Sequence, residues 1–164
     1  MENPEIASSG VSGKNGGRFG LTRVDKFGNS IRHDGLDIAS PVGSNLFAMY
    51  GGIVSDIRTS FSTGEYVEDS FGNYVQITSQ VNGRTIVFKY NHLQNVSVDK
   101  GQNISQGKII GTTGRTGNAA GAEVNPHVHI TRWDISSSEW TLTDPEKYIS
   151  AEYDSDGNLQ SNCN

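Results

Sequence analysis

The stretch NPHVHI, residues 125–130, contains two of the four histidines in the chain, separated by a single valine. Successive side chains of a β-strand point to opposite faces, so His127 and His129 would share one face if this stretch is extended. Two neighbouring imidazoles contribute little to a hydrophobic core, but they can bind a metal ion or transfer protons. The spacing therefore indicates a metal site or a proton-transfer site.

The other two histidines come from distant segments of the chain. His33 lies in the stretch HDGLD, four residues before Asp37, and His92 lies in the stretch YNHL. Zinc readily takes imidazole nitrogen and carboxylate oxygen, and a catalytic zinc typically keeps three protein ligands and one open position. His33, Asp37 and either His127 or His129 would supply such a set. The two remaining histidines could then handle protons near neutral pH.

Other candidate functional groups have simpler explanations. Asp34 adjoins His33 instead of following it by four residues, so we expect its side chain to face solvent. The glycine-rich stretch at residues 111–121 lacks the Gly-Lys-Ser/Thr sequence of a phosphate-binding loop, and turn formation explains it better. Trp133 and Trp140 could stack on sugar rings, but half-buried packing is the ordinary role of such side chains.

Short strands separated by glycine turns are expected to position the histidines. Residues 35–40 and 46–58 contain apolar runs that a Gly-Gly pair interrupts, and residues 127–135 form a further strand candidate. The stretch at residues 59–72 is polar and is expected to be a loop. We find no apolar periodicity typical of a long amphipathic helix. The chain is therefore predicted to be mostly β.

Two stretches, residues 73–80 and 84–93, alternate apolar and polar side chains, and an Asn-Gly pair lies between them. Asn-Gly favours a two-residue hairpin turn, so we expect an antiparallel pair of strands. If the second strand stays extended, His92 would share a face with Tyr90 and Phe88.

The 164-residue chain has 34% hydrophobic residues and 20 glycines, which suits one modest domain with many tight turns. Its net charge of −5, without a block of lysine or arginine, argues against nucleic acid and against an anionic membrane surface as partners. No apolar run is long enough for membrane insertion. The single cysteine, Cys163, excludes an intrachain disulfide and a cysteine-rich zinc finger.

Both ends of the chain are polar. Residues 1–17 are rich in serine, glycine and asparagine, so we expect a flexible linker or a propeptide-like segment. They contain no apolar signal core, which leads us to expect a domain excised from a larger protein with an added start methionine. Asp144 and Pro145 predict one short turn of helix, and residues 150–164 are expected to be a mobile polar tail.

Taken in this order, the histidine motifs resemble those of the lysostaphin- and LytM-type zinc metallopeptidases, the twenty-third metallopeptidase family, which cut the peptide part of bacterial cell wall. The resemblance rests on the stretches HDGLDIASPVGSNLFAMYGGIV, FGNYVQI, KYNHL, VDKGQNISQGKIIGTTGRTG and PHVHITRW. It begins at GRFG, residues 17–20, and ends at DPEKYI, residues 144–149. The expected catalytic domain therefore spans residues 18–149.

The resemblance implies a role for each residue of the site. His33, Asp37 and His129 become the ligands of one Zn²⁺ per chain, and His127 and His92 become the catalytic pair. The implied fold is a compact β-sandwich of antiparallel sheets, of the duplicated hybrid motif type, with the zinc site in an open groove. Two loops are longer than is usual in the family, and they lie before NPHVHI and before FGNYVQI.

The resemblance also implies a substrate and a location. We expect a monomeric endopeptidase that hydrolyses stem peptides or cross-bridges of peptidoglycan. Because peptidoglycan lies outside the cytoplasm, the protein is expected to be secreted, periplasmic or at the cell wall. If it is a delivered antibacterial effector, a cognate immunity protein is expected.

Three other functions would require different residues. A non-catalytic module that binds cell wall or activates another hydrolase would typically have lost metal ligands, whereas all five residues are present here. A phosphocarrier would use two facing histidines and would not need Asp37. A lipoyl-carrying domain would need an exposed lysine at a hairpin tip, and we find none in the sequence.

Overall fold

The computed structural model describes residues 5–162, and β-strands dominate them. The strands are β1 (Glu5–Ile6), β2 (Gly20–Val24), β3 (Ser30–His33), β4 (Leu36–Ala39), β5 (Asn45–Phe47), β6 (Gly52–Arg58), β7 (Asn73–Val81), β8 (Arg84–Val96), β9 (Asn103–Ile104), β10 (Ile109–Thr113), β11 (His127–Asp134), β12 (Thr141–Leu142), β13 (Ala151–Tyr153) and β14 (Leu159–Asn162). The helical segments in this range are the 3₁₀ turns η1 (Gly10–Gly17), η2 (Gly117–Ala120) and η3 (Glu146–Tyr148). The prediction of a mostly β chain is confirmed.

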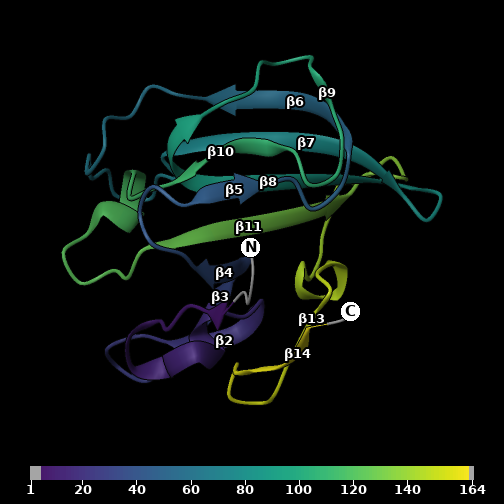
Figure 1. Cartoon of the computed structure of the whole chain (residues 1–164). Helices are drawn as coiled ribbons and strands as arrows, with labels where there is room; N and C mark the ends of the chain where they lie inside the picture. The colour runs from purple at the N-terminus through teal and green to yellow at the C-terminus, as the bar shows by residue number, and fades with distance from the viewer. Residues whose placement is uncertain (1–4, 163–164) are drawn as a thin grey trace.

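The main sheet is antiparallel, with the strand order β1-β4-β11-β8-β7-β6-β9. The long strand β8 connects two layers, because its first part pairs with β7 and β11 and its last part pairs with β10. β10 in turn pairs with β5, and these two short strands lie in front of β7 and β8 (Figure 1). The hydrophobic core includes buried side chains from both layers, such as Ile110 and Leu46 from one and Ile77 and Phe88 from the other.

The β7–β8 hairpin forms as the sequence predicts. Val81 pairs with Arg84, so the turn contains only two residues. Both turn residues have left-handed backbone conformations, with φ of 51° at Asn82 and 75° at Gly83. Such a turn matches the twist of the two strands, and asparagine and glycine tolerate it best. The turn fixes the register of β8, which places His92 beside the first residues of β11.

The buried hydroxyl of Tyr90 gives a stability prediction. It accepts a hydrogen bond from the backbone N–H of Met49 at 2.9 Å, which ties β8 to the segment after β5. In Tyr90→Phe this donor loses its partner, so we expect the free energy of unfolding to fall by about 1–3 kcal/mol in urea titrations. Tyr50→Phe is the matched control, because its partly buried hydroxyl donates to the Tyr148 carbonyl at 3.2 Å. An equal or larger loss in the control would contradict this explanation.

Both ends of the described chain contain more regular structure than the sequence led us to expect. β1 pairs with β4, and Ile6 is buried in the core instead of belonging to a flexible linker. β13 and β14 form a hairpin within the expected polar tail. The expected turn of helix is present as η3, where the Asp144 side chain accepts the N–H of Glu146 at 2.9 Å. Cys163 lies outside the described residues.

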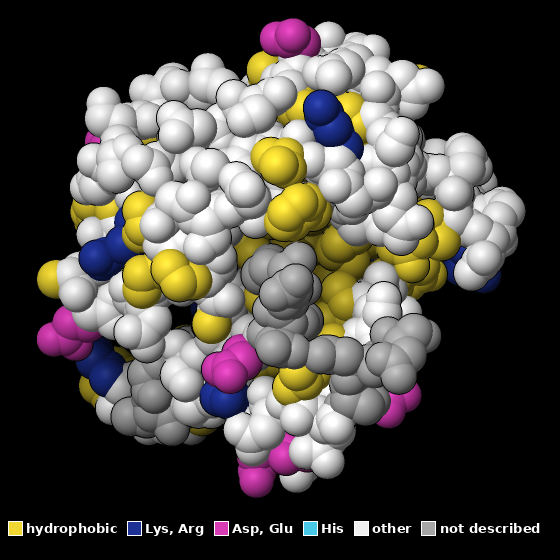
Figure 2. Space-filling view, in the orientation of Figure 1, with side chains coloured by type: hydrophobic (Ala, Val, Ile, Leu, Met, Phe, Trp, Pro, Cys, Tyr) yellow, Lys and Arg dark blue, Asp and Glu magenta, His cyan; other side chains and the backbone are white. Residues whose placement is uncertain are grey.

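The face shown in Figure 2 is largely polar, with small groups of hydrophobic side chains and scattered acidic and basic ones. Lysine and arginine side chains are scattered over this face and form no patch on it. Within residues 5–162, no helix is long and apolar enough to span a bilayer.

Candidate metal centre and active site

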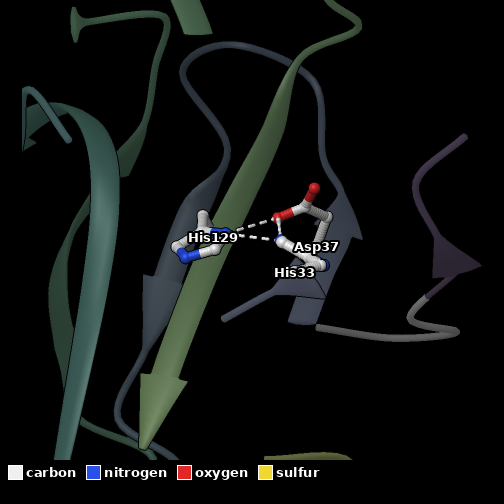
Figure 3. Close-up of side chains that lie close together, drawn as sticks. All are labelled: His33, Asp37 and His129. Atoms are coloured by element: carbon white, nitrogen blue, oxygen red, sulfur yellow. Dashed lines mark hydrogen bonds and ion pairs between the residues drawn. The ribbon is translucent and has the colours of Figure 1, made fainter. Parts of the chain in front are cut away.

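Adjacent strands bring His33, Asp37 and His129 together. β11 pairs with β4 so that His129 lies directly opposite Asp37, and directly opposite residues share a face of the sheet. His33 is the last residue of β3, four residues before Asp37. One ligand atom from each side chain lies within 4.8 Å of the others, and all three are buried. Figure 3 shows the three side chains pointing toward one another.

The three converging atoms are His33 Nε2, His129 Nδ1 and Asp37 Oδ1. His129 Nδ1 lies 2.7 Å from Asp37 Oδ1 and 3.1 Å from His33 Nε2. His33 Nε2 also lies 3.3 Å from the same carboxylate oxygen. The other ring nitrogen of His33 donates its hydrogen to the Arg18 carbonyl at 2.8 Å. In the neutral form of the ring, Nε2 of His33 therefore directs a lone pair at a carboxylate oxygen.

This donor set fits a cation such as zinc. A lone pair facing a carboxylate at 3.3 Å is repulsive unless a positive charge lies between the two atoms. Two imidazole nitrogens and one carboxylate oxygen are ordinary zinc ligands, and three of them leave a fourth position open. The backbone contact of His33 is typical of a metal-binding histidine, whose second nitrogen usually donates to a carbonyl or carboxylate.

Gly35 explains how His129 fits against the HDGLD segment. A β-carbon at this position would lie 2.6 Å from His129 Cε1 and 2.6 Å from the Ile130 carbonyl oxygen. Real β-carbons do not approach other atoms so closely, so any larger residue would displace the His129 ring. The ring also stacks on Phe71, with a centroid distance of 5.3 Å. Neither contact was anticipated from the sequence, although the glycine between His33 and Asp37 was a visible signal.

The electrostatics of the site favour an ionised Asp37 beside a neutral His129. Burial opposes ionisation of Asp37, but the hydrogen bond from His129, together with the neighbouring imidazoles, outweighs it and holds the pKa of the carboxyl well below its usual range. Burial lowers the pKa of His129, against the opposing effect of its bond to Asp37. Ionised carboxylate and neutral imidazole are the forms that bind metal.

His127 and His92 form a second pair beside the three converging residues. Their ring centroids are 5.1 Å apart, and His127 Nε2 lies 3.7 Å from Asp37 Oδ1. The Nδ1–H of His127 donates to the Asn125 carbonyl at 2.7 Å, and that of His92 donates to the Thr116 carbonyl at 3.0 Å. In both rings the Nε2 atom is therefore unprotonated in the neutral form and free to accept a proton.

The predicted face of His92 is wrong, because strand β8 is not regular at this residue. The register of β7 and β8 shifts here, with Tyr74 opposite Asn91 and Asn73 opposite Leu93. His92 is the extra residue of this bulge and has a left-handed φ of 65°, which is uncommon for a residue other than glycine. The bulge turns its ring away from the core residue Tyr90 and toward His127. Strain of this kind is often found at functional sites.

The burial of His92 gives a pH prediction for the metal-free protein. Burial, followed by the charges of His127 and His129, lowers the pKa of His92 from 6.5 to about 3. Between these pH values the unfolded chain binds a proton that the native state excludes, so stability falls as pH drops from 6.5 toward 3. The slope of the unfolding free energy against pH is proportional to the number of protons taken up on unfolding. In His92→Gln this number, and with it the slope, should be smaller by about one proton. An unchanged slope in urea titrations would contradict this.

A cavity of about 520 Å³ opens over both groups of residues. The residues that line it are Ser8, Ser9, Arg23, Arg32, His33, Asp34, Asp37, Asp69, Phe71, His92, Asn118, Ala119, Glu123, Val124, Asn125, His127 and His129. Three of them, residues 123–125, come from the long segment before His127. The five candidate residues thus face one cavity whose rim includes that segment.

The structure also places the residues for which the sequence suggested simpler explanations. Asp34 is exposed and pairs with Arg32 at 3.1 Å, as expected for a solvent-facing carboxylate. The glycine-rich stretch forms the end of β10 and the turn η2, in agreement with the turn interpretation. Trp133 and Trp140 contact each other with a centroid distance of 6.4 Å, and Trp140 is largely exposed.

Comparison with known proteins identifies the family. The sequence model described as peptidase family M23 matches residues 31–139, a range that includes all five candidate residues. The chain belongs to peptidase family M23. Sequence relatives of this M23 chain include the peptidoglycan DD-endopeptidases ShyA and ShyC of Vibrio cholerae. They are 34% and 36% identical over 97 residues, which is 59% of this chain and 19% of each relative. The chain thus spans about a fifth of these relatives' length.

Solved structures resemble the M23 chain over most of its length. The catalytic domain of lysostaphin from Staphylococcus simulans has a TM-score of 0.58 and 24% identity, and the match covers 80% of this chain and 87% of that domain. A zinc-containing peptidase from Vibrio cholerae has a TM-score of 0.58 and 26% identity, with 77% and 34% covered. The first similarity is one of fold, and it confirms the expected lysostaphin-like architecture of antiparallel sheets.

Proposed function

We propose that this M23 domain is a zinc-dependent endopeptidase that hydrolyses peptide bonds in the stem peptides or cross-bridges of peptidoglycan. The observation that carries the proposal is the convergence of His33 Nε2, Asp37 Oδ1 and His129 Nδ1 beside the His127–His92 pair. The peptidoglycan endopeptidases among its relatives support the substrate class.

His33, Asp37 and His129 would hold one zinc ion. When bound there, zinc would act as a Lewis acid and make water a stronger acid. The metal site and the proton-transfer groups are adjacent, because His127 Nε2 is only 3.7 Å from the ligand oxygen of Asp37. A substrate peptide in the cavity would therefore meet both at once.

His127 and His92 would move the protons of the reaction. Carbonyl oxygens of Asn125 and Thr116 fix their tautomers, so each Nε2 can accept a proton from water and return it to the leaving amine. Protonated, each ring could also donate a hydrogen bond to the negative oxygen that develops during the reaction. Burial keeps His92 neutral at neutral pH in the metal-free protein, so its Nε2 carries a free lone pair there.

The proposed substrate determines where the domain would act. We infer that the domain acts outside the cytoplasm as a secreted, periplasmic or cell-wall enzyme, and that it acts as a monomer. If it is an antibacterial effector, an immunity protein should bind near the cavity.

Residues 18–149 are proposed as the catalytic domain. The alternative of a non-catalytic module would be favoured by a missing ligand, whereas all five side chains line the cavity.

Digestion of purified sacculi tests the function. We expect the zinc-loaded protein to release peptides with new amino-termini, which labelling and mass spectrometry would detect and place in the stem or the bridge. A chelated sample is the control. Zinc-loaded protein that binds sacculi of several peptide types but releases no new amino-termini would contradict the enzyme and support the binding module.

A further inference from the structure

The carboxylate of Asp37 has two oxygens with different surroundings. Oδ1 faces His33 and His129, whereas Oδ2 accepts a hydrogen bond from Arg23 Nη2 at 2.5 Å. Only 6% of the Asp37 side chain is exposed, so an oxygen without a partner would be costly at this position. Arg23 therefore satisfies the oxygen that the metal would leave free.

Arg23 is itself held in place. Its Nε donates to the Gly16 carbonyl at 2.7 Å, and 29% of its side chain is exposed. The register of β2 against β3 shifts between Gly20 and Arg23, and a bulge of this kind redirects the side chains that follow it. The guanidinium thus bridges the 3₁₀ segment η1 and the ligand Asp37.

We propose that Arg23 is a positioning residue of the metal site, which fixes Asp37 in the rotamer that presents Oδ1 to the metal. This inference rests on the proposed zinc function. A ligand held by an outer partner does not have to be ordered when metal binds, so its affinity for metal is higher. A charge-assisted bond from a guanidinium is well suited to this role.

The inference assigns a role to a part of the chain outside the family match. That match begins at residue 31, yet the outer partners of two candidate ligands come from before it. Arg18 supplies the carbonyl that orients His33, and Arg23 supplies the cation that orients Asp37. The Arg18 side chain is fixed by the Asp154 carbonyl at 2.7 Å, which connects this segment to the C-terminal hairpin. The segment before residue 31 is thus part of the metal site.

The positioning role and the positive charge of Arg23 predict opposite changes in zinc affinity when the residue is replaced. Arg23 is a cation near the metal site, so by Coulomb's law alone its removal would tighten the binding of Zn²⁺. If Arg23 positions Asp37, its removal should weaken zinc binding, by about 10–100-fold as is typical for outer partners of metal ligands. The direction of the change therefore separates the two effects.

The experiment measures zinc affinity by competition with a chromophoric chelator, using the whole chain and zinc alone, without substrate. Arg23→Gln removes the charge and the guanidinium, and Arg23→Lys keeps the charge but lacks the second nitrogen that contacts the Gly16 carbonyl. Arg32→Gln is the matched control, because Arg32 also lines the cavity but pairs with Asp34. Thermal unfolding of each metal-free variant reports damage to the fold.

We expect Arg23→Gln to bind zinc about 10–100-fold more weakly than the wild type, and Arg23→Lys to lie between them. Arg32→Gln should keep the wild-type affinity. The metal-free Arg23 variants should still unfold cooperatively, at a somewhat lower temperature because the buried Asp37 Oδ2 loses its donor. Equal or tighter binding by Arg23→Gln would overturn the inference while leaving the proposed function intact, and so would an equal weakening in Arg32→Gln. A wild-type chain that binds no zinc would overturn the proposed function itself.

Discussion

Replacing Asp37 by alanine is expected to abolish both zinc binding and peptide hydrolysis. The substitution removes the carboxylate oxygen toward which His33, His129 and His127 all point. Two imidazoles alone make a poor zinc site at neutral pH, so the loss of affinity should exceed the about 10–100-fold loss expected for an outer partner. Zinc content after dialysis and peptide release from sacculi would measure the two effects.

Asp34→Ala is the matched control for this prediction. Asp34 lies in the same HDGLD segment, and its side chain is exposed and paired with Arg32. We expect this variant to bind zinc and to release peptides as the wild type does. Full zinc content in Asp37→Ala, or loss of zinc in Asp34→Ala, would show that the carboxylate ligand has been assigned to the wrong residue.

His127→Ala is expected to keep its zinc but to lose most of its activity. His127 is not among the three converging side chains, and its Nε2 is placed to exchange protons beside them. A positioned general acid or base contributes about 10²–10⁴-fold to a rate, so kcat should fall within that range. Initial rates on sacculi, divided by the measured zinc content, would give this number.

His92→Ala separates the members of the catalytic pair. Its ring is 5.1 Å from that of His127, and we expect zinc retention with a loss of rate there too. Because the two rings act on the same proton transfers, the double variant should lose less than the product of the two single losses. Loss of zinc from His127→Ala would contradict the assignment and favour the alternative in which His127 is a ligand.

The strand pattern of the sequence predicts much of the site. A side-chain period of two in an extended strand places His127 and His129 on one face, and β11 pairs with β4 so that His129 meets Asp37. The Asn-Gly turn likewise fixes the pairing of β7 and β8. The shared face of the two histidines and the hairpin turn are local features, for which short-range rules are sufficient. The pairing of β11 with β4 joins residues 92 apart in the chain and follows from the fold.

The contacts that depend on irregular backbone were not predictable. A bulge at His92 reverses the face that simple alternation assigns to it, and nothing in the stretch YNHL signals an extra residue. A second irregularity in β2 directs Arg23 to Asp37. Such contacts join residues that are far apart in the chain, so they follow from the folded structure and not from local spacing.

The chain ends were also misjudged, for a different reason. β1 contains only two residues, and its contribution is one buried side chain, Ile6, and backbone pairing with β4. η1 is polar and rich in glycine, which is typical of linkers, yet its Gly16 carbonyl anchors Arg23. Composition reports apolar burial well, but it does not reveal a segment that is held by backbone hydrogen bonds.

The central claim is that three converging side chains hold a zinc ion that peptide hydrolysis requires. Its most direct test is elemental analysis of the purified protein combined with release of new amino-termini from sacculi, before chelation, after chelation and after zinc is restored. We predict about one zinc per chain, no release after chelation and full recovery with zinc. A folded protein that binds no zinc, or that hydrolyses sacculi equally well after its zinc has been removed, would contradict the claim.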